Sequence, residues 1–148
     1  MRTWLTNIQW CPGCWDTLII MALKNAFKEL AIESHNRVVV SGVGCSGKAS
    51  QYVDGYAAET LHGRALPFAT WVKLARPELT VVIMWWDGDG YGIGMGHFIH
   101  SCKRNLNMTY LVFNNENYAL TTGQASPTTP LWAKTKTTPE WNKSLPFD

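Results

Sequence analysis

The stretch "VVIMWWDGDGYGIG", residues 81–94, decides the fold of this chain. Its first six residues are all apolar, which is typical of a strand buried on both faces of a parallel sheet. Glycines and aspartates follow at once and predict a tight loop at the end of this strand. Two further runs, "RVVVSGVG" (residues 37–44) and "MTYLVFNN" (residues 108–115), have the same form. The sequence therefore predicts three buried strands, each followed by a glycine-rich or polar loop.

Helical segments accompany these strands. Apolar residues recur at helical spacing in "TLIIMALKNAFKEL", residues 17–30, and residues 62–76 and 96–104 are also expected to be helical. The alternation predicts an α/β fold, a doubly wound and mostly parallel sheet. A chain of 148 residues suits one domain, residues 1–148. The polar, Pro- and Thr-rich sequence after Asn115 is expected to be a loop.

The composition excludes two classes of partner. Lysine and arginine outnumber aspartate and glutamate by only 13 to 11, so the chain lacks the basic field that holds nucleic acid or an anionic membrane. Its apolar runs are much shorter than the roughly 18 residues of a membrane span. The N-terminal sequence also lacks the apolar region of a secretory signal, and we therefore expect a cytoplasmic protein.

Polar residues at the ends of two predicted strands indicate a magnesium site. Asp87 follows one strand and Asn115 ends the next, and the backbone carbonyl of Asn117 can add a third oxygen. Mg²⁺ binds such oxygens together with those of a phosphate group. Glycines 88 and 90 would let the backbone approach a phosphate closely. Asp89 competes with Asp87 because "DGDG" repeats the pattern, and a simple hairpin turn would explain those four residues alone.

Cysteines form a second candidate site. Cys11 and Cys14, in "CPGC", have the spacing of thiolates that bind one metal ion or cluster, and Cys45 at a strand end can supply a third. The spacing suits zinc and iron–sulfur equally, and a disulfide or two buried thiols are the alternatives. Cys102, beside two basic residues on a predicted helix, is expected to be an ordinary half-buried cysteine.

A phosphate-binding loop is a weaker candidate. The sequence "GVGCSGKA", residues 42–49, fits the pattern G-x-x-x-x-G-K after a strand. A nucleotide-binding loop of this kind needs serine or threonine after the lysine to hold Mg²⁺, and the chain has Ala49 there. The following sequence is also a poor start for a helix, so the pattern argues against a nucleotide-hydrolysing enzyme.

Six motifs in order resemble a known family. They are "WCPGC", "SGVGCSGK", "LHGRALPFAT", "DGDGYGIG", "HFIH" and "NNENYALTTGQASPTT", and together they resemble the β subunit of the 2-oxoacid:ferredoxin oxidoreductases, the chain that binds thiamine diphosphate. The resemblance covers nearly the whole chain and implies the thiamine-diphosphate-binding type of α/β fold. In the family a fourth cluster cysteine lies further downstream, so the chain is expected to match about the first half of the subunit.

The resemblance implies a role for each matching residue. Asp87, Asn115 and the Asn117 carbonyl would hold Mg²⁺, and Cys11, Cys14 and Cys45 would be three ligands of a [4Fe–4S] cluster. The remaining residues would contact thiamine diphosphate or lie near it and the substrate carboxylate: Gly44, Cys45, Ser46, Lys48, His62, Arg64, Gly88, Asp89, Ala119 and Leu120.

The resemblance also implies a reaction and partners. Thiamine diphosphate attacks a 2-oxoacid and holds the electron pair after CO₂ leaves. The cluster would pass the electrons singly to ferredoxin, and the acyl group would go to coenzyme A. Because the family completes its active site with a glutamate from a partner, an α subunit, and in some complexes γ and δ subunits, would be needed. Pyruvate, 2-oxoglutarate and bulkier 2-oxoacids all fit.

Tryptophan is unusually frequent, with eight residues against five phenylalanines and five tyrosines. Six of the eight occupy positions where the resembled family typically has glycine: Trp15, Trp71, Trp85, Trp86, Trp132 and Trp141. One hypothesis is that UGA codons, read as glycine in the source organism, were translated as tryptophan. The alternative is a degenerate, non-catalytic subunit that keeps the fold and a partner interface.

Overall fold

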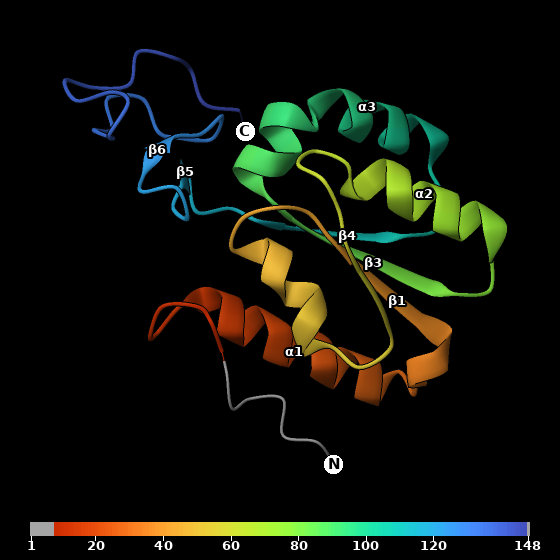
Figure 1. Cartoon of the computed structure of the whole chain (residues 1–148). Coiled ribbons are helices and arrows are strands. Elements are labelled where there is room, and N and C mark those ends of the chain that lie inside the picture. Colours follow the sequence, from red (N-terminus) through yellow and green to blue (C-terminus); the bar gives the residue numbers. More distant parts are fainter. Residues whose placement is uncertain (1–7, 148) are drawn as a thin grey trace.

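A computed structural model describes residues 8–147, so the domain predicted over residues 1–148 extends past the described range at both ends. Three α-helices and a four-stranded sheet form its body (Figure 1). The helices are α1 (Trp15–Glu29), α2 (Ala65–Ala75) and α3 (Met95–Arg104), and the strands are β1 (Arg37–Ser41), β2 (Tyr56–Glu59), β3 (Thr80–Trp86), β4 (Thr109–Phe113), β5 (Asn117–Tyr118) and β6 (Gln124–Ala125). Short helical turns cover Ser34–Asn36 (η2), Ser46–Tyr52 (η3) and Gly88–Ile93 (η4).

The main sheet has the order β2-β1-β3-β4, and every neighbouring pair is parallel. Helix α1 covers one face, while α2 and α3 cover the other (Figure 1). The predicted doubly wound α/β fold is therefore confirmed. Strand β2 was not predicted, because "YAAE" lacks the β-branched residues of a buried strand. It lies at the edge of the sheet, where most of its side chains are exposed.

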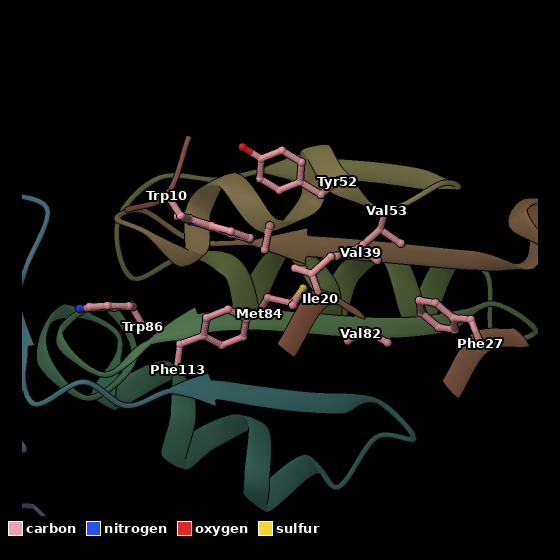
Figure 2. Packing of buried hydrophobic residues seen from close by; sticks show 11 residues of the cluster. Trp10, Ile20, Phe27, Val39, Tyr52, Val53, Val82, Met84, Trp86 and Phe113 are labelled. Carbon is pink, nitrogen blue, oxygen red and sulfur yellow. The ribbon is translucent and has the colours of Figure 1, made fainter. Parts of the chain in front are cut away.

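Strand β3 divides the core into two halves. Because side chains alternate along a strand, Val82, Met84 and Trp86 pack with residues of α1 (Figure 2). Ile83 and Trp85 point to the other face and pack with residues of α2. Six consecutive side chains of this strand, from Val81 onward, are buried. Full burial of a side chain the size of Ile83 contributes about 1.5–3 kcal/mol to folding. With six such buried positions, β3 forms the centre of the core, as its apolar sequence predicts.

The loop after β3 differs from its expectation in one respect. Trp85 and Trp86 lie in β3, as the apolar run predicts, and the turn begins after Asp87. This turn is a π-helical one, η4, instead of a tight glycine loop. A Cβ atom at Gly88 would collide with the Tyr118 ring and one at Gly90 would crowd the Tyr110 hydroxyl. Both glycines are therefore needed for packing against tyrosines of the chain itself.

The remaining segments agree with the sequence in outline. After Asn115 the chain is irregular except for the two-residue strands β5 and β6, as its polar composition predicts. The loop after β1 leads into the short 3-10 turn η3 rather than an α-helix, so the weak case for a nucleotide-binding loop gains no support. Within residues 8–147, no helix combines the length and apolar character needed to cross a membrane.

Candidate cofactor site

Asp87 lies at the carboxyl end of β3 and is fully buried. Its Oδ2 atom accepts a hydrogen bond of 2.7 Å from the Thr128 hydroxyl, and its Oδ1 atom accepts a long one, 3.4 Å, from the backbone N–H of Asn115. Oδ1 is therefore the more weakly engaged of the two oxygens. A buried carboxylate of this kind is stabilised by partners such as these or by a cation.

Asn115 and Asn117 lie beside Asp87 in the loop after β4. The Asn115 side-chain oxygen accepts a 3.3 Å hydrogen bond from the backbone N–H of Asn117. The carbonyl oxygen of Asn117 accepts one of 3.0 Å from the indole of Trp86. One carboxylate, one amide oxygen and one carbonyl thus gather across two strand ends, and such hard oxygen donors fit Mg²⁺. The Trp86 indole, however, donates to the carbonyl that Mg²⁺ would use and so competes for this oxygen.

Asp89 has a different position in the structure. Its carboxylate is buried and accepts hydrogen bonds from the backbone N–H groups of Gly63, at 2.6 Å, and Val43, at 3.1 Å. It also contacts Nδ1 of His62. Burial raises the pKa of the Asp89 carboxyl, and the Gly63 N–H and His62 oppose that rise. Asp89 thus joins the loops after β1, β2 and β3. Both of its oxygens accept hydrogen bonds of 3.1 Å or less, whereas Oδ1 of Asp87 accepts one of 3.4 Å, so Asp87 is the better candidate ligand.

The loop after β1 presents the other predicted cofactor contacts. Gly44 has a φ of +104°, a conformation that favours glycine. The buried Ser46 hydroxyl has no hydrogen-bond partner among residues 8–147, so a ligand could satisfy it. Lys48 donates from Nζ to the Gln9 carbonyl at 3.4 Å, which directs it toward the N-terminal segment. Arg64, before α2, is exposed.

The turn between β5 and β6 contains the last predicted contacts. Ala119 and Leu120 are exposed there, and the Ala119 carbonyl accepts a hydrogen bond of 3.1 Å from the N–H of Thr122. Tyr118 precedes them and donates from its hydroxyl to the Gly88 carbonyl at 2.9 Å. This hydrogen bond connects the turn to the start of η4, where the cofactor diphosphate is expected.

The cysteines are free thiols, so the disulfide alternative is not observed. Cys11 and Cys14 close a turn through the 3.0 Å hydrogen bond from the Cys14 N–H to the Cys11 carbonyl. Burial raises the pKa of the thiols of Cys14 and Cys45. In the described part of the chain, no three His, Cys, Asp or Glu side chains are grouped so that they could hold a metal ion. Cys102 is exposed rather than half-buried.

One residue of this site, Thr128, was not predicted from the sequence. Its buried hydroxyl lies 2.7 Å from Oδ2 of Asp87 and 2.8 Å from Oδ1 of Asn114. Thr128 therefore links the ends of β3 and β4. Thr128 lies in "SPTT", at the end of the last quoted motif. A threonine in a Pro/Thr-rich segment does not by itself indicate a contact with a distant carboxylate.

Comparison with known proteins identifies this arrangement. Residues 34–148 match the C-terminal TPP binding domain of the thiamine pyrophosphate enzymes. The chain belongs to this family. Thiamine pyrophosphate is thiamine diphosphate, so the expected cofactor class is confirmed at the level of the domain.

Curated relatives support the more specific resemblance. The chain is 49% identical over 148 residues to 2-oxoglutarate synthase subunit KorB of Archaeoglobus fulgidus, covering 100% of this chain and 55% of the relative. It is 51% identical over 140 residues to the β subunit of 2-oxoacid:ferredoxin oxidoreductase 2 of Aeropyrum pernix, covering 91% and 45% of the two chains. The chain thus spans about half the length of these relatives, and the resemblance to the β subunits is confirmed.

A solved structure has the same fold. The 2-oxoglutarate:ferredoxin oxidoreductase from Magnetococcus marinus, with 2-oxoglutarate, coenzyme A and succinyl-CoA bound, matches with a TM-score of 0.94 and 42% identity. The match covers 96% of this chain and 49% of that one. The fold of the thiamine-diphosphate-binding type is therefore confirmed.

Proposed function

We propose that this chain is the cofactor-binding part of the β subunit of a 2-oxoacid:ferredoxin oxidoreductase. The complex would convert a 2-oxoacid and coenzyme A into an acyl-CoA, CO₂ and a proton, and the two electrons released would reduce two ferredoxins. The observation that supports this most is the group of oxygens from Asp87, Asn115 and Asn117 at two neighbouring strand ends, in a chain about half identical to such β subunits.

Two loops of this chain would hold the cofactor. Asp87 and Asn115 would bind Mg²⁺, and the backbone around Gly88 would lie along the diphosphate. When bound, thiamine diphosphate supplies the carbanion that attacks the 2-oxo carbon and the ring that holds the electron pair after decarboxylation. Ser46 and Gly44 would contact the cofactor from the opposite loop. His62, fixed by Asp89, would lie beside the site with its Nε2 atom available for the substrate.

The assembled complex tests this function directly. We expect it to exchange labelled CO₂ into the carboxyl group of at least one 2-oxoacid from a panel that includes pyruvate and 2-oxoglutarate. The exchange should require added thiamine diphosphate and Mg²⁺, because decarboxylation is reversible only on the bound cofactor. A complex that binds the cofactor but exchanges no 2-oxoacid would contradict the proposed reaction.

We also propose that Cys11, Cys14 and Cys45 contribute to a [4Fe–4S] cluster, with a further ligand from outside residues 1–148. Cys45 directly precedes Ser46, so cluster and cofactor would be neighbours, as single-electron transfer requires. Burial and, to a smaller extent, the charges of Asp16, Cys14 and Cys11 raise the pKa of the Cys45 thiol, which supports the proposal that the two cysteine segments are near each other.

Substitution of one cysteine is expected to remove the cluster. In the anaerobically purified complex, Cys45→Ser should lose most of the broad visible absorption and iron assigned to this chain, because an alkoxide is a poor substitute for a thiolate ligand. Cys102→Ser, which alters an exposed cysteine outside the group, should retain both. Stoichiometric zinc instead of iron in the unsubstituted protein would contradict the assignment.

A non-catalytic subunit is the second candidate function. One contact favours it: the hydrogen bond of 3.0 Å from the Trp86 indole to the carbonyl of Asn117. If Trp86 is the natural residue, the third Mg²⁺ ligand is engaged by the protein itself. The chain would then keep its fold and partner surfaces while binding the cofactor poorly.

A further inference from the structure

Thr128 holds a central position behind the candidate Mg²⁺ site. It lies in the irregular segment after β6, yet its side chain is buried and reaches the ends of both β3 and β4. Neighbouring hydroxyls hold this segment in place. The Thr129 hydroxyl donates to the Glu116 carbonyl at 2.6 Å and accepts from the backbone N–H of Ser126 at 2.7 Å. These hydrogen bonds of the neighbouring residue Thr129 fix the backbone next to Thr128.

The donor and the acceptor can be assigned for the two hydrogen bonds of Thr128 to Asp87 and Asn114. A hydroxyl has a single hydrogen, whereas both Asp87 Oδ2 and Asn114 Oδ1 lie within 2.8 Å of it. The ionised carboxylate is the stronger acceptor, so the hydroxyl donates to Asp87. The amide of Asn114 can rotate by 180° and donate its NH₂ group to the hydroxyl oxygen. The result is a chain of hydrogen bonds that runs from Asn114 through Thr128 to Asp87.

This chain distinguishes the two oxygens of Asp87. Oδ2 receives a short hydrogen bond from Thr128, while the hydrogen bond to Oδ1 from the N–H of Asn115 is long, 3.4 Å. We propose that Thr128 is a positioning residue, which holds the Asp87 carboxylate so that Oδ1 is the oxygen presented to the divalent cation. This inference rests on the proposed function, because it concerns the same cofactor site. Ligating carboxylates that are held by such a partner bind metal more tightly.

The test compares three variants in the assembled complex. Calorimetry would measure thiamine diphosphate binding as a function of Mg²⁺ concentration. Thr128→Val keeps the shape but removes the donor, and we expect it to raise the Mg²⁺ concentration for half-maximal binding about 10- to 100-fold, the effect of one hydrogen bond to a charged group. Thr128→Ser restores the hydroxyl and should return the value to within a few-fold of the unsubstituted complex. Thr109→Val, at the exposed start of β4, is the matched control.

Each outcome has a distinct meaning. A Thr128→Val complex with a lower melting temperature but an unchanged Mg²⁺ requirement would overturn the inference and leave only a structural role for this residue. Failure of Thr128→Ser to restore binding would overturn it as well. If the unsubstituted complex shows no Mg²⁺-dependent binding at all, the proposed function itself fails, and the inference fails with it.

Discussion

Replacement of Asp87 by alanine is expected to abolish Mg²⁺-dependent binding of thiamine diphosphate. Asp87 is the only one of the three proposed oxygen ligands that carries a charge, and it is fully buried. Loss of a buried charge opposite a cation costs on the order of 3–5 kcal/mol, which corresponds to a loss of more than a hundredfold in affinity. Titration calorimetry of the complex with and without Mg²⁺ measures this directly.

Two further variants separate charge from shape. Asp87→Asn keeps an oxygen that can accept the hydrogen bond from Thr128, so the fold should be retained while the affinity still falls. Asp54→Ala, an exposed acidic residue before β2, should leave binding unchanged. Asp89→Asn is also informative, because Asp89 binds the protein rather than the metal. Unchanged cofactor affinity in Asp87→Ala, with a loss in Asp89→Asn, would transfer the metal site to Asp89.

The sequence predicts most of this fold because hydrophobic periodicity records burial. Strand β3 is apolar throughout and lies at the centre of the sheet, and the predicted helix over residues 17–30 is observed as α1 within two residues at each end. Strand β2 was not predicted, because an exposed edge strand needs no apolar pattern. The π-helical turn η4 was also hidden, since glycine-rich sequence allows many conformations and packing against Tyr118 selects one.

The candidate site was predictable only in part. Asp87 and Asn115 could be found because carboxyl ends of neighbouring parallel strands meet at one edge of a sheet. The contact of Asp89 with His62 joins residues 27 positions apart (89 − 62), and nothing in their local sequence signals it. Thr128 is hidden for the same reason, because its role depends on where an irregular segment folds back. Long-range hydrogen bonds of this kind are decided by tertiary structure.

The six tryptophans at expected glycine positions differ in how well they fit the structure. Trp85 is fully buried, and its indole N–H has no hydrogen-bond partner among residues 8–147. An unpaired buried donor costs about 1–3 kcal/mol. Trp132 has a φ of +68°, which suits glycine far better than a bulky residue. Trp15 and Trp71 lie exposed on helices, and the structure offers no physical reason for glycine at either position.

Trp86→Gly is the decisive variant for this hypothesis. If glycine is the natural residue, the substitution frees the Asn117 carbonyl, and we expect thiamine diphosphate to bind at least about tenfold more tightly, the effect of one restored ligand. The melting temperature should stay level or rise. If tryptophan is natural, the same change empties part of the core and should destabilise the domain by about 3–5 kcal/mol.

The matched control is Trp10→Gly. Trp10 packs in the same core cluster as Trp86 and donates from its indole to the Cys45 carbonyl at 2.7 Å, but it belongs to the motif "WCPGC" in which the resembled family also has tryptophan. Its loss should therefore destabilise the protein under either hypothesis, by about 3–5 kcal/mol. Equal destabilisation by Trp86→Gly and Trp10→Gly, together with UGG codons at most of the six positions in the gene, would refute the recoding hypothesis. The hydrogen bond from Trp86 to Asn117 would then be a native feature, and it would favour the non-catalytic subunit.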